Sequence, residues 1–159
     1  MTRLITANPS QTRYCSTVTQ SVTIHRTPDI VWEEIGDFAG LARWVRDVQK
    51  TGLLSKTKRG IGAAREISFS DGSHVIEYAV GWAEKSYISY IATSGLPLEG
   101  YHATISILQK GGASEVSWTS FLISDSQDRK KFDEFLGFIE SFYSDSLKNL
   151  KARLENQAY

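Results

Sequence analysis

The stretch DSQDRKKFDEFLGFIESFYSDSLKNLKARLENQAY, residues 125–159, decides the fold. It contains no proline, and Gly137 is its only glycine. Its apolar residues recur every three or four positions, at Phe132, Leu136, Ile139, Tyr143, Leu147, Leu150 and Leu154. This period predicts an amphipathic helix of roughly six turns, with Asp125 or Ser126 as its N-cap.

The chain before this helix is dominated by strand patterns. Residues 17–25 alternate and are rich in β-branched side chains, which predicts a first strand. Six more strands are expected at 49–55, 63–69, 73–82, 86–93, 101–109 and 115–123. Short turns join these six, so they form an antiparallel meander, and the first strand must join an edge or close the sheet.

Two short helices are expected between the first and second strands. Thr27 suits an N-cap and Pro28 suits the first helical position, while Gly36 ends this helix. Asp37 is the expected cap of a second helix that runs to about Ala42. Phe38, Leu41 and Trp44 are expected to face inward from this region.

These elements predict an α+β fold in which a curved, seven-stranded antiparallel sheet wraps around the long C-terminal helix. Neither a sheet nor an amphipathic helix can bury its apolar face alone, so the two must pack together. A single helix on a strongly curved sheet often leaves a hollow between them. We expect residues 17–159 to form one domain and residues 1–16 to be an N-terminal extension.

Composition limits the class of protein. The 159 residues hold 18 Lys and Arg against 18 Asp and Glu, so charge gives no argument for nucleic acid as a partner. No apolar run is long enough for stable membrane insertion, and no signal peptide is evident, so a cytoplasmic location is expected. The only cysteine is Cys15, and no metal-ligand spacing or cofactor fingerprint occurs; metal and cofactor are both expected to be none.

Several local signatures occur in a characteristic order. They are Ile24–Trp32, Asp37-Phe38 with Trp44, Gly62 with Arg65, Asp71-Gly72 with Glu77, Leu96-Pro97 with Tyr101, Val116-x-Trp118, and 143–151. The ordered set resembles the START/Bet v 1-like (SRPBCC) helix-grip superfamily, most closely its polyketide cyclase/dehydrase and lipid transport branch. The resemblance covers about residues 17 to 155 and implies the helix-grip fold. It leaves the activity open, because the superfamily includes lipid carriers, hormone receptors and cyclases.

Arg65 is the strongest single candidate for a functional residue in the hollow. It shares a strand face with the apolar Ile67 and Phe69, so it points into the hollow if that face is concave. A buried guanidinium needs a partner, and Glu77 can supply it in one of two hairpin registers. A two-residue turn at Asp71-Gly72 places Glu66 opposite Glu77, whereas a three-residue loop with a left-handed Gly72 places Arg65 there. Opposite charges favour the second register, and the resemblance also points Arg65 and Glu77 inward.

The second register has a consequence for the other face of the sheet. Ile76, Tyr78, Val80 and Trp82 would then face outward. Such an apolar stripe would need cover, either from a partner subunit in a homodimer or from the N-terminal extension.

Aromatic side chains complete the candidate ligand-binding set. Tyr90, Tyr101 and Trp118 can share the concave face with small residues, and Phe135, Ile139 and Phe142 come from the long helix. The helix is aromatic in its first half and narrows to Leu147, Leu150 and Leu154, so a cavity mouth is expected near the first half. Buried hydroxyl and indole groups there would need a polar partner, such as a ligand or a trapped water.

Three functions remain open from the sequence. The first is binding or transport of a small hydrophobic or amphipathic ligand, with Arg65, Glu77 and a tyrosine at its polar end. The second is a polyketide cyclase/dehydratase-like enzyme in which Glu77, Tyr90 or Tyr101 transfers protons and Arg65 steadies an enolate. The third is a non-catalytic interaction protein with a filled cavity.

His25, His74 and His102 lack the spacing of metal ligands, and all three side chains are expected at the surface.

Overall fold

The structure, a computed structural model, describes residues 13–157. Its strands are β1 (Cys15–Ile24), β2 (Val48–Leu53), β3 (Ala64–Phe69), β4 (His74–Ala83), β5 (Tyr87–Ser94), β6 (Leu98–Lys110) and β7 (Ala113–Ser124). Its helices are α1 (Pro28–Ile35), the short 3₁₀ helix η1 (Leu41–Arg43) and α2 (Arg129–Glu155). The predicted α+β class and order of elements are thus confirmed.

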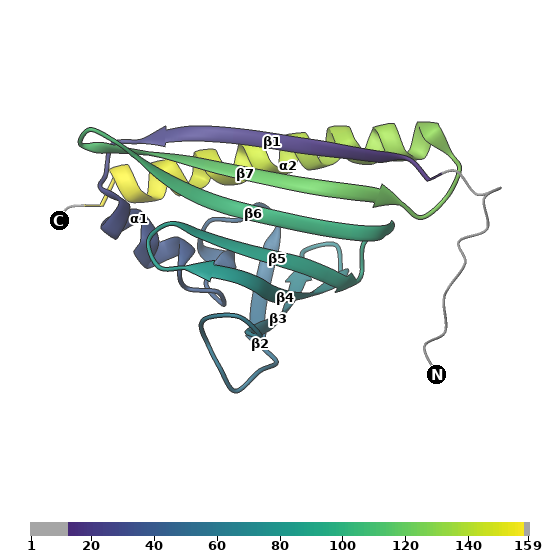
Figure 1. The fold of residues 1–159 in the computed structure, drawn as a ribbon, viewed down its shortest axis with the longest axis horizontal. Helices are drawn as coiled ribbons and strands as arrows, with labels where there is room; N and C mark the ends of the chain where they lie inside the picture. The colour runs from purple at the N-terminus through teal and green to yellow at the C-terminus, as the bar shows by residue number, and fades with distance from the viewer. Residues whose placement is uncertain (1–12, 158–159) are drawn as a thin grey trace.

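The seven strands form one antiparallel sheet in the order β1-β7-β6-β5-β4-β3-β2. The first strand joins the edge beside β7, as one of the two expected options. Figure 1 shows α2 running along β1 and β7 while the sheet curves away toward β2. The helix-grip arrangement expected from the sequence is therefore the observed one.

Several predicted boundaries differ from the structure. β1 begins at Cys15, two residues inside the predicted extension, whose residues 1–12 lie outside the described part of the chain. The cap of α2 is Asp128, whose side chain accepts a hydrogen bond from the backbone N–H of Lys131, so Asp125 and Ser126 were the wrong choice. β6 starts at Leu98, before the predicted strand at 101–109, because the segment stays paired with β7 through a bulge at Leu98/Gly100.

The second short helix is also shorter than predicted. Asp37 does not cap a helix; its carbonyl accepts from Gly40 in a turn and its carboxylate bonds Arg43. One turn of 3₁₀ helix follows at Leu41–Arg43. Phe38, Leu41 and Trp44 are all buried, so their predicted inward orientation is confirmed.

The hairpin between β3 and β4 has the three-residue loop. Arg65 pairs with Glu77 across the strands, and Gly72 has a φ of +87°. The turn is held by the Asp71 carboxylate, which accepts from the backbone and hydroxyl of Ser73. Those hydrogen bonds lower the pKa of Asp71. The register in which opposite charges face each other is therefore the observed one.

The predicted outward stripe on β4 is only partly present. Tyr78 and Val80 are exposed and Ile76 is half-buried. The prediction that Trp82 faces outward was wrong. A bulge between Ala79 and Gly81 shifts the alternation of side chains along β4, so the indole of Trp82 packs against Trp32. Cover for the stripe by a second subunit or by residues 1–16 stays a prediction.

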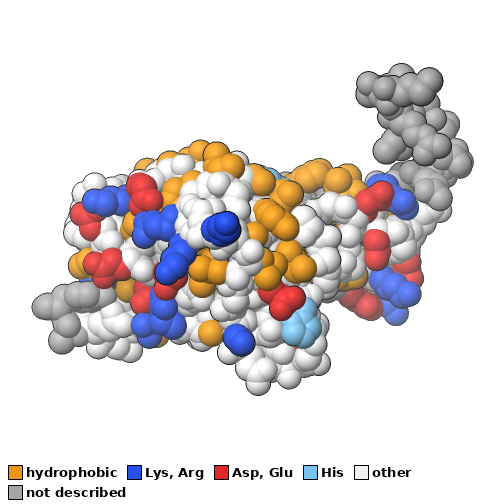
Figure 2. All heavy atoms as spheres, turned by 90° about the horizontal axis from the view of Figure 1, so that it is seen from below, with side chains coloured by type: hydrophobic (Ala, Val, Ile, Leu, Met, Phe, Trp, Pro, Cys, Tyr) orange, Lys and Arg blue, Asp and Glu red, His pale blue; other side chains and the backbone are white. Residues whose placement is uncertain are grey.

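Another exposed apolar group belongs to the loop between β2 and β3. Leu54 and Ile61 in this loop are 54% and 71% exposed. Figure 2 views the molecule from the side on which this loop lies and shows hydrophobic side chains across the middle of that face, with a few charged ones among them.

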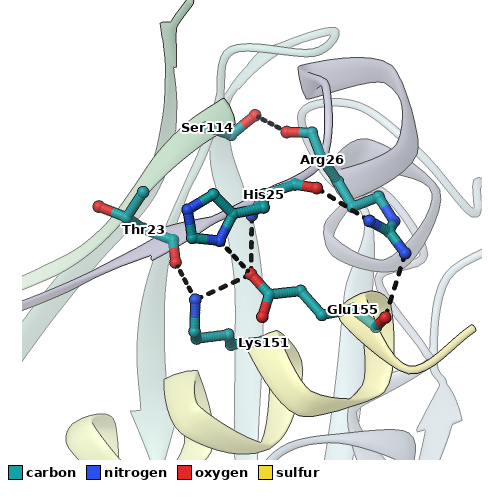
Figure 3. Close-up of polar contacts among 6 residues, drawn as sticks. All are labelled: Thr23, His25, Arg26, Ser114, Lys151 and Glu155. Atoms are coloured by element: carbon teal, nitrogen blue, oxygen red, sulfur yellow. Dashed lines mark hydrogen bonds and ion pairs between the residues drawn. The ribbon is translucent and has the colours of Figure 1, made fainter. Parts of the chain in front are cut away.

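The C-terminal end of α2 is fixed to the β1–α1 connection by a polar cluster (Figure 3). The Glu155 carboxylate accepts from the backbone N–H of His25 at 2.8 Å, from its Nδ1 at 2.9 Å and from Lys151 Nζ at 2.8 Å. Arg26 donates to the Glu155 carbonyl, an acceptor left without an intrahelical partner at the end of α2, and to the Gln157 carbonyl just beyond that end. The hydrogen bonds from Lys151, first of all, and from His25 lower the pKa of the Glu155 carboxyl to about 2.

Tight packing accompanies this polar cluster. Leu147, Leu150 and Leu154 on the second half of α2 are at most 1% exposed. The sealed end and the aromatic end of the helix are therefore distinct, as the graded pattern of the sequence predicted.

Candidate functional site

A pocket with a volume of about 650 Å³ lies between the concave face of the sheet and the first half of α2. All eight predicted ligand-binding residues line it: Arg65, Glu77, Tyr90, Tyr101, Trp118, Phe135, Ile139 and Phe142. The strands supply the first five and α2 supplies the last three. The alternation along the strands and the helical period thus predicted which residues lie around one pocket. That these residues bind a ligand stays a prediction.

Arg65 and Glu77 form a buried ion pair in the pocket, with side chains 4% and 7% exposed. Arg65 Nε and Nη2 lie 2.8 and 2.6 Å from Glu77 Oε2. Arg65 Nη1 donates to the Phe38 carbonyl at 2.8 Å, and the guanidinium carbon lies 3.9 Å from the centre of the Phe38 ring. Burial raises the pKa of the Glu77 carboxyl, and the charge of Arg65 opposes that rise.

Tyr90, Tyr101 and Trp118 form the floor of the pocket, and Tyr143 packs behind them without lining it. Trp118 Nε1 donates to the Tyr90 hydroxyl at 2.8 Å, and the hydroxyls of Tyr101 and Tyr143 bond each other. The Trp118 and Tyr143 rings stack with their centres 4.1 Å apart. The polar partners expected for these groups thus come from the protein itself.

Burial sets the ionisation of these hydroxyls. The pKa values of Tyr90 and Tyr101 are raised well above the ordinary value, chiefly because the phenolate would be desolvated. Desolvation raises the pKa of Tyr143 as well. The floor therefore presents neutral phenols.

The α2 wall of the pocket consists of aromatic and aliphatic side chains from its first half. Phe135, Phe138 and Phe142 stack in sequence along the helix, with ring centres 5.9 Å apart at each step. Phe142 also contacts Trp118 and Phe69 from the sheet. Phe138 is 48% exposed, so this row leads from solvent to the pocket floor.

The rim includes a corner that the sequence analysis missed. Asp47 has a φ of +59°, a left-handed conformation that Asp tolerates better than most residues. Its carbonyl accepts from the backbone N–H and hydroxyl of Ser70 in the β3–β4 hairpin, at 2.9 and 3.1 Å. This contact joins the start of β2 to the hairpin tip. No sequence signal pointed to it, because the partners are 23 residues apart in the chain.

Other lining residues were also missed. Leu41 and Val45, near η1, and Leu96 and Pro97, between β5 and β6, all line the pocket. Gly95 allows the β5–β6 loop to lie close to β4, because a Cβ there would meet the His74 carbonyl oxygen at 1.9 Å.

No group of His, Cys, Asp and Glu side chains within residues 13–157 is arranged to hold a metal ion. His25, His74 and His102 are exposed, in agreement with the sequence analysis. None of the helices in the described part of the chain is both long and apolar enough to cross a membrane.

Comparison with known proteins gives one family. Residues 16–155 match the family model described as polyketide cyclase / dehydrase and lipid transport. No curated protein sequence matches the chain.

Solved structures share the fold. XoxI from Bacillus cereus superposes with a TM-score of 0.76 at 25% identity, covering 89% of this chain and 96% of that one. An uncharacterised protein from Bacillus thuringiensis gives a TM-score of 0.74 at 25% identity, covering 89% and 100%. Ara h 8.0201 gives 0.75 at 14% identity, covering 91% and 100%, and at this identity the likeness concerns the fold alone.

Proposed function

The chain belongs to the polyketide cyclase/dehydrase and lipid transport family, within the START/Bet v 1-like superfamily, and from this premise we propose that it binds or carries a small hydrophobic or amphipathic molecule between the sheet and α2. The observation that carries the proposal is the pocket of about 650 Å³. Its volume lies within the range of small-molecule sites. The third hypothesis, a cavity filled by the protein's own side chains, has no support from such a pocket.

The lining of the pocket supports an apolar ligand. Phe69, Phe135, Phe138 and Phe142 offer large apolar surfaces that gain from removal of water. The polar lining residues fall in two places: Arg65, Glu77 and the tyrosines at the floor, and a group at the rim made of Asp47, Ser70, Asp71 and Ser73. Apolar walls with a few placed polar groups are the usual composition of a site that recognises a small molecule.

A second candidate function is a cyclase or dehydratase-like reaction in the same pocket. One observation favours it: Glu77 is a buried carboxyl with a raised pKa that lines the pocket, as a general base requires. Tyr101 and Tyr90 would then act as neutral hydrogen-bond donors to a developing oxyanion. Turnover of a poly-β-ketone by wild-type protein, lost in Glu77→Gln, would establish this reaction, whereas binding without turnover would leave the carrier role.

Binding of a neutral fluorescent probe, N-phenyl-1-naphthylamine, tests the carrier role. We expect saturable binding that Phe142→Ala weakens about tenfold, because a pocket-lining ring is removed. Phe121→Ala is the matched control, since Phe121 is 44% exposed on β7 and does not line the pocket. Absence of saturable binding, or equal losses in the two variants, would refute the proposal.

Native mass spectrometry of the protein purified from its own source would identify the ligand class. A small molecule that co-purifies with wild-type protein and is lost from Phe142→Ala would be the expected result.

A further inference from the structure

The charge of the pocket constrains the polar end of its ligand. Among the described residues that line it, Asp47, Asp71 and Glu77 are acidic and Arg65 is the only Lys or Arg. Asp47 also bonds Arg46 beside the rim, at 3.0 Å. The entrance therefore offers no unpaired cation among its lining residues.

Arg65 is already occupied by the protein. Each of its three nitrogens has a partner, either Glu77 Oε2 or the Phe38 carbonyl, and the Phe38 ring covers its guanidinium. These contacts use three of the five N–H donors of a guanidinium. A ligand carboxylate that approached the two remaining donors would meet the charge of Glu77 beside them. Because a buried anion needs full compensation, this floor disfavours an anionic ligand.

Glu77 presents the opposite situation. Both contacts with Arg65 use Oε2, and within residues 13–157 no hydrogen bond is made by Oε1. A carboxylate oxygen accepts hydrogen bonds but cannot donate them when ionised. The side chain is 7% exposed and lines the pocket. Oε1 can therefore accept a hydrogen bond from a ligand in the pocket.

The neighbouring hydroxyls do not fill this need in the structure, because neither forms a hydrogen bond with Glu77. Tyr101 bonds Tyr143, and Tyr90 accepts from Trp118. These bonds hold the aromatic floor rigid around Glu77.

Resting on the proposed function, we propose that the ligand presents an uncharged hydrogen-bond donor, the hydroxyl of a phenol or alcohol, to Glu77 Oε1. Glu77 is then the residue that determines specificity, and Arg65 is a positioning residue that orients its carboxylate. The pocket selects hydroxylated apolar molecules over carboxylates of the same size.

Three bicyclic probes of similar size test this selection by displacing N-phenyl-1-naphthylamine at pH 7: 2-naphthol, 2-methoxynaphthalene and 2-naphthoate. We expect 2-naphthol to bind about tenfold or more tightly than 2-methoxynaphthalene, since only naphthol can donate to a charged acceptor. We expect 2-naphthoate to bind most weakly of the three.

Glu77→Gln supplies the second measurement. It keeps an acceptor oxygen and removes the negative charge, so the ratio of naphthol to naphthoate affinity should fall at least about tenfold. Glu66→Gln is the control, because Glu66 lies on the same hairpin and does not line the pocket. A merely structural role for Glu77 would change all three affinities alike.

The outcomes separate this inference from the proposed function. Equal affinities, tightest binding of naphthoate, or displacement by none of the three while the reporter still binds would overturn the inference alone. Failure of the reporter and all probes to bind would overturn both. The order of affinities in wild-type protein decides the matter even if Glu77→Gln fails to fold.

Discussion

Replacement of Arg65 by methionine should strongly destabilise the fold, because Arg65 joins two parts of the molecule. It pairs with Glu77 inside the sheet and reaches the Phe38 carbonyl in the segment between α1 and η1. Methionine keeps much of the side-chain volume and removes the charge. Glu77 would then be left as an unpaired carboxylate in the interior.

The expected magnitude follows from burial. Both side chains are under 10% exposed, at 4% and 7%, so solvent cannot replace the lost partner. Breaking a buried ion pair by removing one member costs about 3–5 kcal/mol. With a urea m-value of about 2 kcal/mol/M, the unfolding midpoint should fall by about 1.5–2.5 M.

Urea unfolding followed by tryptophan fluorescence measures this change. Arg59→Met is the matched control, because Arg59 also pairs with a glutamate, Glu84, and lies over an aromatic ring, but at 54% and 56% exposure. The control should lose no more than about 1 kcal/mol. The double variant Arg65→Met/Glu77→Gln should be more stable than Arg65→Met, since no charge is then left unpaired. A loss in Arg65→Met as small as in the control would refute the reasoning.

Three other substitutions test the rest of the fold. Glu155→Gln should cost about 1–2 kcal/mol at neutral pH, a value reduced for partial exposure. The folded-state pKa of Glu155 is about 2, below the ordinary 4.5, so this loss of stability should be complete above pH 4.5 and vanish as the pH falls through 2. Acid unfolding measures this, and the control Glu140→Gln, on an exposed part of α2, should show no such pH dependence. Gly95→Ala should prevent stable folding or lower the thermal midpoint sharply, because its Cβ would lie 1.9 Å from a carbonyl oxygen of β4; Gly72→Ala, with a similar positive φ and open space, should cost only about 1 kcal/mol, and equal losses would contradict this. Leu150→Ala should cost about 3–5 kcal/mol in chemical denaturation, because Leu150 is fully buried, and a loss under 1 kcal/mol would show that the end of α2 is not sealed.

Much of the architecture could be predicted because its signals are local. The spacing of apolar residues distinguished the helix α2 from the strands, and the opposite charges of Arg65 and Glu77 indicated the register of their hairpin. The side-chain period of two then placed Tyr90, Tyr101 and Trp118 around one pocket.

The remaining features depend on contacts that no local pattern encodes. The bulge before Trp82 reverses the alternation of β4 and could not be located from composition. The rim contact between Asp47 and Ser70 requires the positions of β2 and the hairpin in space. Likewise, the bonds that occupy Arg65 and leave Glu77 Oε1 unbonded follow from tertiary geometry.

The central claim, that a hydrophobic molecule binds between the sheet and α2, is tested most directly by the indole signals in ¹H–¹⁵N NMR spectra. The chain has 4 tryptophans, and Trp118 lines the pocket while Trp32 and Trp82 donate to Glu84 outside it. Titration with N-phenyl-1-naphthylamine should move the Trp118 Nε1–H signal in a saturable manner and leave those of Trp32 and Trp82 nearly in place. An unchanged Trp118 signal at saturating probe, or larger shifts at Trp32 and Trp82, would contradict the claim.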